Sequence, residues 1–205
     1  YSTIAGKRSI SAVEIKNKKS WWKKILLSDY YFFDNKKHIL KNNLEPLRIL
    51  KIKYDLVQDL PNISSKVTDR MKIKLTQLGI TDFIIFHPSA QYSYKVYPQS
   101  LRHELLSLLS KFNIAVVVTG GNNEIDLAIK NNLPLLENIF NWIGQTSIEE
   151  YIALSALSQG YIGMDTLNMH IAAAQNKRVF AIFGPTILSM WSPWSNKLQR
   201  SATID

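Results

Sequence analysis

The chain has 205 residues, of which 46% are hydrophobic and 20% are charged, a composition typical of a globular protein with one domain or two small ones. It contains no cysteine, which excludes disulfides and thiolate metal ligands, and its four histidines lack the spacing of a metal site, so we expect no metal. The formal net charge is +9, no apolar run reaches the length of a membrane span and no secretory signal is visible, so a cytoplasmic location is expected.

The positive charge is concentrated in the first part of the chain. Residues 1–80 carry 17 Lys and Arg against 7 Asp and Glu, a net charge of +10, whereas residues 81–205 carry 8 against 9. Such a basic segment attracts nucleic acid, anionic lipid or phosphorylated glycan. A solvated, lysine-rich surface explains the same pattern equally well, so the charge by itself leaves the partner open.

The first 80 residues have an irregular pattern that contains two predicted helices. Leucine and isoleucine spacing predicts an amphipathic helix over 38–50, in which Pro46 produces a kink or a break. A second helix is predicted over 67–78 and is ended by Gly79. Asp, Pro, Asn and Ser gather near 53–66, which predicts a linker.

From residue 81 onward, short apolar runs alternate with helical patterns. Unbroken apolar runs separated by helices are typical of a parallel sheet that is covered on both faces. Right-handed crossovers then produce a Rossmann-like, doubly wound α/β fold. The predicted strands lie at 83–86, 114–119, 139–142, 161–164 and 179–183, and the predicted helices begin near Pro98, Asn122, Thr146 and Thr166.

Four loops follow these strands and should meet at the carboxyl edge of the sheet, where open α/β folds bind ligands. The last loop leads from Asp165 into a helix whose first backbone N–H groups are free to hold phosphate. Lys95 can pair with a diphosphate and Glu124 with ribose hydroxyls, although a surface lysine and a favourable charge on a first helical turn explain them as well. Four other polar side chains of these loops fit either a phosphate site or ordinary helix caps: Ser89, Asp165, Thr166 and Asn168. His170 fits either a contact with the phosphate or sugar, or a buried histidine with its own hydrogen-bond partners.

Six short motifs follow one another between residues 81 and 194. They are His-Pro-Ser-Ala at 87–90, Lys-x-x-Pro at 95–98, Val-Val-Thr-Gly-Gly-x-x-Glu at 117–124, Gly-x-Thr-Ser at 144–147, Asp-Thr-x-x-Met-His-x-Ala-Ala-Ala at 165–174 and Phe-Gly-Pro-Thr at 183–186. In this order and spacing they resemble the bacterial heptosyltransferases of lipopolysaccharide and lipooligosaccharide core synthesis. The resemblance implies the GT-B arrangement of two facing Rossmann-like domains. It also implies inverting transfer without metal or cofactor, from a nucleotide sugar, commonly ADP-heptose, to an anionic lipid-linked oligosaccharide acceptor.

The resemblance also implies roles for individual residues. Lys95 would contact the phosphate or sugar of the donor, and Glu124 the ribose. The diphosphate loop would consist of Asp165, Thr166, Leu167 and Asn168, supported by His170, with Ser89 as a further donor-binding residue. The family usually has Gly where this chain has Leu167, and a Leu side chain limits how closely the backbone approaches a phosphate.

The resemblance divides the chain into two parts. Residues 1–60 look like a mostly helical remnant of the acceptor-binding domain with the linker, and residues 61–205 like the nucleotide-sugar-binding domain. The family's general base, an Asp in an early loop of the amino-terminal domain, has no counterpart in residues 1–80, so we expect it outside this chain. A positioned base contributes about 10²–10⁴-fold to a rate. The chain is therefore expected to bind donor but to transfer poorly.

The basic segment leaves two further interpretations open. It fits a phosphorylated acceptor and peripheral contact with the inner membrane surface, in which case no nucleic acid is expected as a partner. Alternatively, the chain is a nucleic-acid-binding module that uses Trp21, Trp22, Tyr30 and Tyr31 for stacking. A different GT-B nucleotide-sugar enzyme, such as an epimerase or a hexosyltransferase, is the remaining alternative.

Overall fold

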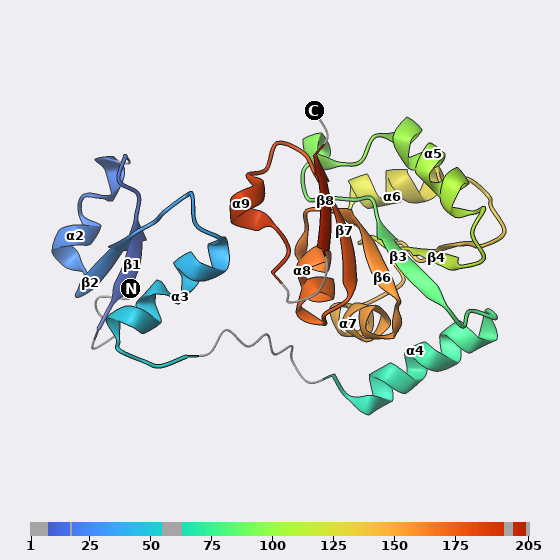
Figure 1. Ribbon diagram of the computed structural model, residues 1–205, viewed down its shortest axis with the longest axis horizontal. Helices are drawn as coiled ribbons and strands as arrows, with labels where there is room; N and C mark the ends of the chain where they lie inside the picture. Colours follow the sequence, from blue (N-terminus) through green and yellow to red (C-terminus); the bar gives the residue numbers. More distant parts are fainter. Residues whose placement is uncertain (1–7, 17, 55–62, 195–198, 204–205) are drawn as a thin grey trace. The chain divides into compact units, whose positions relative to one another are not determined.

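The computed structural model describes residues 8–16, 18–54, 63–194 and 199–203. The chain divides into two compact units (Figure 1). The first consists of Tyr1–Val57 together with Ile187–Trp191, and the second of Gln58–Thr186 together with Ser192–Asp205. The assignment of residues 1–60 to an acceptor-binding domain stays a prediction. Among the described residues, no helix combines the length and the apolar character needed to span a bilayer.

The first unit contains a small parallel sheet that the sequence did not indicate. β1 (Ile10–Val13) pairs in parallel with β2 (Asp29–Phe32), and η1 (Lys18–Ser20) and α2 (Lys23–Leu26) lie between them in the chain. The short α9 (Leu188–Trp191) also belongs to this unit. The aromatic run after residue 29 is therefore a strand, in which Tyr30 and Phe32 stay exposed with their rings 5.6 Å apart.

The predicted helix over 38–50 is confirmed as α3 (Ile39–Ile49). His38 is its N-cap, and its Nδ1 accepts a hydrogen bond from the Leu40 N–H at 3.2 Å. Pro46 lies inside the helix rather than at a break. Asn42 is the buried residue of α3. Its side-chain amide donates a hydrogen bond to the Asp34 carbonyl oxygen at 2.9 Å, and this bond ties α3 to the segment after β2.

The second unit is a six-stranded parallel sheet, which confirms the predicted Rossmann-like fold. Its strands are β3 (Phe83–His87), β4 (Ala115–Val118), β5 (Ile139–Asn141), β6 (Gly160–Met164), β7 (Arg178–Phe183) and β8 (Gln199–Thr203), in the order β5-β4-β3-β6-β7-β8. All five predicted strands are present, and β8 is an additional edge strand. The helices between them are α5 (Gln99–Leu109), α6 (Glu124–Asn131), α7 (Ile148–Leu157) and α8 (Leu167–Ala174), with η2 (Ser93–Lys95) after β3.

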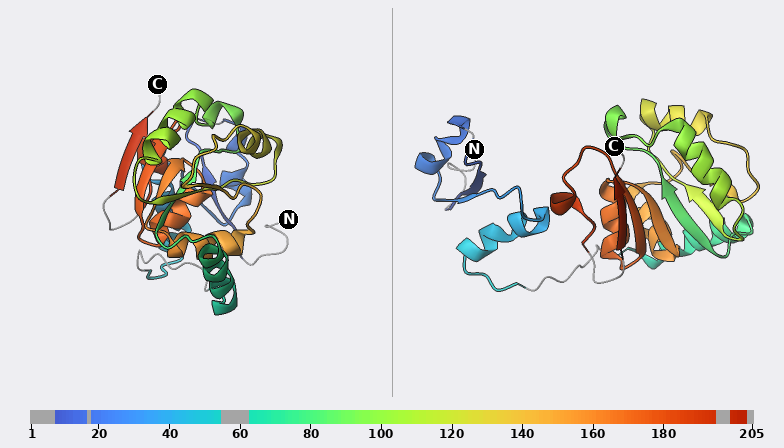
Figure 2. Two further views of the ribbon diagram at one scale, coloured as in Figure 1. Left: turned by 90° about the vertical axis from the view of Figure 1, so that its right-hand side faces the viewer. Right: turned by 45° about the horizontal axis from the view of Figure 1, so that its top comes forward.

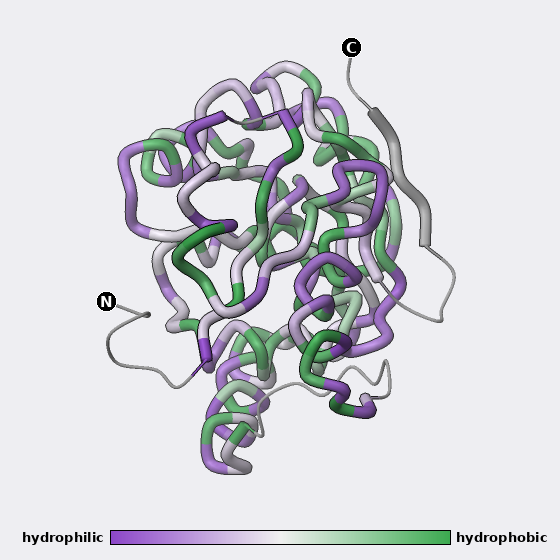
Figure 3. Tube along the Cα trace, turned by 90° about the vertical axis from the view of Figure 1, so that its left-hand side faces the viewer, coloured by the Kyte–Doolittle hydropathy of each residue, from purple (hydrophilic) through white to green (hydrophobic). Residues whose placement is uncertain are grey.

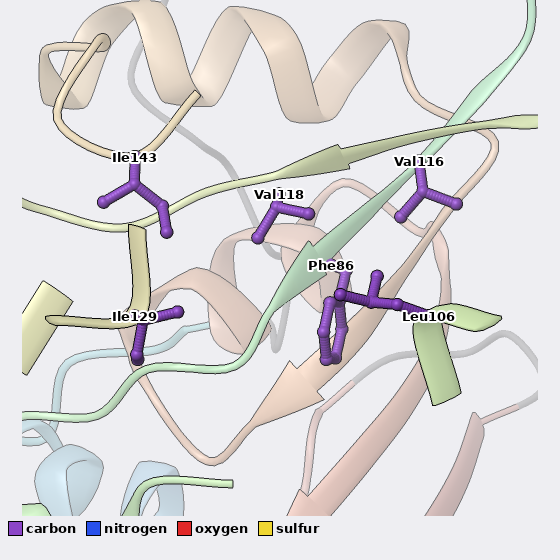
Figure 4. Packing of buried hydrophobic residues seen from close by; sticks show 6 residues of the cluster. All are labelled: Phe86, Leu106, Val116, Val118, Ile129 and Ile143. Carbon is purple, nitrogen blue, oxygen red and sulfur yellow. The ribbon is translucent and has the colours of Figure 1, made fainter. Parts of the chain in front are cut away.

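Helices cover both faces of this sheet (Figures 1 and 2). On one face, α5 and α6 contribute Leu106 and Ile129 to a buried cluster with the strand residues Phe86, Val116 and Val118 and with Ile143, which follows β5 (Figure 4). On the other face, α8 packs against β6 and β7, and α7 contacts α8. Successive strand residues point to opposite faces, so only strands that are apolar throughout can be covered on both sides.

α4 (Ser65–Gln77) confirms the second predicted helix and packs against α7. Hydrophobic and hydrophilic residues alternate along it (Figure 3), and Met71 and Leu75 form its buried side. Gly79 follows its end with φ 69°, as the sequence predicts. The predicted linker near 53–66 lies mostly outside the described residues.

The order of the strands places a switch point between β3 and β6. The chain proceeds from β3 through β4 to β5, and then returns to place β6 on the opposite side of β3. His87 pairs with Gly163 across this junction. A Cβ atom at Gly163 would overlap the His87 carbonyl oxygen and lie 2.8 Å from the Tyr161 hydroxyl oxygen, so the two strands can meet here only with glycine.

Candidate functional site

A cavity of about 480 Å³ opens at the carboxyl edge of the sheet, at this switch point. Ligands of open α/β folds bind at such a point because the loops after the two neighbouring strands diverge there. Residues that follow β3, β4 and β6 and that begin α7 line the cavity. They are His87, Ser89, Ala90, Gln91, Tyr92, Lys95, Thr119, Gly120, Gly121, Asn123, Asp126, Thr146, Ser147, Ile148, Tyr151, Asp165, Thr166, Leu167 and Asn168.

The amino-terminal end of α8 forms one wall of the cavity. Its N-cap residue, Thr166, makes no capping hydrogen bond with its side chain among the described residues. The neighbouring α7 differs, because Ser147 and Glu150 form a complete capping box. The first N–H groups of α8 therefore remain available to an anion, and the helix dipole adds to their positive potential.

Lys95 brings a cation to the same wall. Its Nζ lies 3.5 Å from Oδ2 of Asp165, and the two side chains are only 22% and 8% exposed. Lys95 comes from η2 after β3 and Asp165 from the end of β6, so the ion pair spans the switch point. The cavity thus combines an ammonium group with a helix amino terminus, an arrangement that binds phosphate groups.

His87 lines the cavity together with its neighbours Thr119, after β4, and Asn168, from α8. Burial lowers the pKa of His87 to about 4. The charge of Asp126 and a backbone hydrogen bond with Thr119 raise this pKa, but their effects are smaller than that of burial. The imidazole is therefore neutral near pH 7. The Asn168 amide Nδ2 donates to its Nδ1 at 2.9 Å, and the Thr119 hydroxyl lies 3.1 Å from the same nitrogen. These contacts tie the first turn of α8 to the end of β3.

The structure brings six of the eight predicted donor-binding residues together around the cavity: Ser89, Lys95, Asp165, Thr166, Leu167 and Asn168. Leu167 is 63% exposed at the rim. Glu124 is exposed on the first turn of α6, and His170 is half-buried in α8; neither is among the residues that line the cavity. The individual roles of all eight stay predictions.

The sequence does not indicate the place of two lining residues, Asp126 and Tyr151, in the cavity. It also does not indicate that the imidazole of His87 is buried. Asn123 and Asp126 have the i, i+3 spacing of a helix cap, which indicates their local hydrogen bonds but not their place in the cavity. Tyr151 lies in an apolar stretch of α7, where an aromatic residue is expected in the core. Within the described ranges, no group of three or more His, Asp and Glu residues is arranged to hold a metal ion.

The sequence is similar to that of known glycosyltransferases. The family model of glycosyltransferase family 9 (heptosyltransferase) matches residues 27–203. Lipopolysaccharide heptosyltransferase 3 of Escherichia coli is 26% identical over 165 residues, which cover 78% of this chain and 48% of that protein. The chain therefore spans about half the length of the curated relatives it matches.

Solved structures of similar proteins share the fold. The crystal structure of a family 9 glycosyl transferase from Veillonella parvula DSM 2008 superimposes with a TM-score of 0.74 at 17% identity, covering 90% of this chain and 53% of that one. E. coli heptosyltransferase WaaC with ADP superimposes with a TM-score of 0.66 at 15% identity, covering 90% and 56%.

Proposed function

Because this chain belongs to glycosyltransferase family 9, the heptosyltransferase family, we propose that it acts in the transfer of a heptose from ADP-heptose to a lipopolysaccharide or lipooligosaccharide core acceptor. The solved structure of WaaC is a complex with ADP, which supports adenine as the base of the donor. The observation that carries the proposal is the cavity at the switch point, where Lys95 and the free amino terminus of α8 face the same space.

The chemistry of the transfer follows from where negative charge develops. An acceptor hydroxyl attacks the anomeric carbon of the heptose from the side opposite the diphosphate, so a new C–O bond forms while the bond to the diphosphate oxygen breaks. The leaving ADP gains charge on its terminal phosphate, and Lys95 and the α8 N–H groups stabilise that charge. The transfer therefore inverts the configuration at the anomeric carbon. Lys95 and the N–H groups of α8 neutralise the charge that a metal ion neutralises in other enzymes.

The proton of the acceptor hydroxyl needs a general base, which we place outside this chain. Residues 1–60 then represent part of the acceptor-binding domain and the linker, and residues 61–205 the donor-binding domain. The chain binds donor and transfers poorly without the group that supplies the base.

The first unit suits an anionic acceptor. Lysines 18, 19 and 24 are exposed there beside Trp21 and Trp22. Lysines attract phosphorylated glycans and anionic headgroups, and tryptophan favours the membrane interface. We therefore include peripheral contact with the inner membrane surface, and a cytoplasmic location, in the proposal.

Calorimetric titration with ADP, UDP, GDP and CMP tests the proposed donor. We expect ADP to bind preferentially and Lys95→Ala to weaken it about 10- to 100-fold, because a charge-assisted contact is lost. Lys111→Ala, which removes an exposed lysine after α5, is the matched control and should bind ADP like the wild type. Preference for UDP would indicate a different GT-B nucleotide-sugar enzyme. A folded sample that binds none of the four nucleotides would refute the proposal.

A further inference from the structure

We propose that His87 is a positioning residue of the donor site. Its Nδ1 accepts a hydrogen bond from the Asn168 side chain, and this bond holds the first turn of α8 where its N–H groups bind the diphosphate. The inference rests on the proposed function, since it assumes that the diphosphate of a donor binds at the amino terminus of α8. His87 does not need to contact the donor, because it acts through Asn168.

The first turn of α8 is only weakly fixed by its own hydrogen bonds. Its N-cap residue, Thr166, makes no capping hydrogen bond with its side chain in the described part of the chain. The bond from the His170 N–H to the Thr166 carbonyl oxygen is 3.4 Å long, whereas the equivalent bond of α7, from Tyr151 to Ser147, is 2.9 Å long. A contact with β6 is also long, because the hydroxyl oxygens of Tyr161 and Thr166 are 3.5 Å apart. The position of this turn therefore depends on contacts with other elements more than that of α7 does.

Asn168, the second residue of α8, makes a shorter contact of this kind. Its Nδ2 lies 2.9 Å from Nδ1 of His87, the last residue of β3, and 3.4 Å from Nε2 of the same ring. The NH₂ group of an amide can only donate, and a neutral imidazole has one acceptor nitrogen. Nδ1 is therefore the acceptor, and Nε2 carries the proton. The Thr119 hydroxyl lies 3.1 Å from Nδ1 and contacts the ring from the side of β4.

His87 is a rigid partner for this hydrogen bond. It is 7% exposed, and its backbone pairs with that of Gly163 in β6 across the switch point. Burial also keeps the imidazole neutral, and an imidazolium would have no acceptor nitrogen to offer. The bond from Asn168 thus connects the loosely fixed turn of α8 to the centre of the sheet.

The position of this turn matters because the helix sets the direction of the N–H groups that bind the diphosphate. A hydrogen bond weakens steeply away from its preferred distance and angle. Without the bond between Asn168 and His87, the turn has additional freedom, which a bound donor must remove at a cost in affinity. Loss of this bond should therefore weaken the binding of ADP even though neither side chain carries a charge to the phosphates.

Calorimetric titration of the full chain with ADP tests the inference through two variants of nearly equal shape. Asn and Leu both branch at Cγ, and the Oδ1 of Asn can replace the imidazole Nδ1 as the acceptor. We expect His87→Asn to bind ADP within about 2-fold of the wild type and His87→Leu to bind it about 3- to 10-fold more weakly. A residue that merely fills space would not produce this order, because both variants leave a similar part of the ring volume empty.

Asn168→Ala removes the same hydrogen bond from its donor side, at a half-buried position, and takes the place of His87→Leu if the latter does not fold. It should weaken the binding of ADP by a similar factor. The double variant with His87→Leu should lose no more affinity than either single variant, because the two substitutions remove one interaction. His103→Leu, which changes a histidine of α5 outside the cavity lining, is the control and should bind ADP like the wild type.

Three outcomes would overturn the inference. The first is that His87→Asn and His87→Leu bind ADP equally well, and the second is that Asn168→Ala binds ADP like the wild type. The third is that the losses of the two single variants add in the double variant. Failure of the wild type to bind ADP at all would instead refute the proposed function on which the inference depends.

Discussion

The neutral state of His87 predicts a specific dependence of stability on pH. The pKa of His87 falls from 6.5 to about 4 on folding, with burial as the main cause. The unfolded chain therefore binds more protons than the folded chain between these two values, so stability decreases as the pH falls below 6.5 and rises as the pH increases. From the two pKa values, the free energy of unfolding attributable to His87 drops by about 2 kcal/mol between pH 7 and pH 5.

Urea unfolding at pH 7, 6 and 5 measures this dependence. His87→Gln cannot take up the proton, so its free energy of unfolding should fall by about 2 kcal/mol less than that of the wild type over the same range. The comparison uses the change with pH within each protein, so a constant destabilisation caused by the substitution cancels. Equal changes in the two proteins would show that His87 is not held neutral in the folded state, and would refute a buried, uncharged imidazole in the cavity lining.

Two further substitutions test the packing that positions the cavity. Gly163→Ala places a Cβ atom against the His87 carbonyl oxygen and the Tyr161 hydroxyl, so it should destabilise the protein by about 1–3 kcal/mol in urea unfolding. Gly184→Ala is the matched control, because the nearest contact of the added Cβ atom would be the Tyr94 carbonyl oxygen at an ordinary 4.0 Å. A similar loss of stability in both variants would contradict the close approach of the strands at the switch point. Ser147→Ala removes the hydroxyl that accepts the Glu150 N–H at 3.2 Å and should lower the melting temperature, at a cost of about 1 kcal/mol. An unchanged melting temperature would mean that the capping box does not stabilise α7.

Local sequence patterns were sufficient for the buried part of the sheet. β3, β4 and β6 are covered on both faces, so most of their positions favour an apolar residue and the run is visible without knowledge of the fold. The start of α7 was equally clear, because Ser147 and Glu150 satisfy each other across a single turn. In both cases the pattern that reveals the element lies within a few residues of the chain, although the strands themselves pair with distant segments.

β8, at one edge of the large sheet, was not visible in this way, although β5 at the other edge was. β8 has the sequence Gln-Arg-Ser-Ala-Thr, and it is a strand because its backbone pairs with β7 in register from Val179–Gln199 to Phe183–Thr203. An edge strand does not need an apolar run, and its hydrogen bonds come from residues distant in the sequence. The same holds for β1 and β2, whose pairing joins Ile10 to Asp29.

The sequence by itself determined that loops after separate strands would meet at one edge of a parallel sheet, because strand polarity follows from the alternation of strands and helices. It also placed six of the predicted donor-binding residues at the cavity. Only the tertiary structure decided that Asp126 rather than Glu124 is among the residues of α6 that line that cavity, that the imidazole of His87 is buried and neutral, and that Lys95 meets Asp165. Those three outcomes depend on the rotation of a helix, on the exclusion of water and on the order of the strands, and each of these is fixed by contacts between segments far apart in the chain.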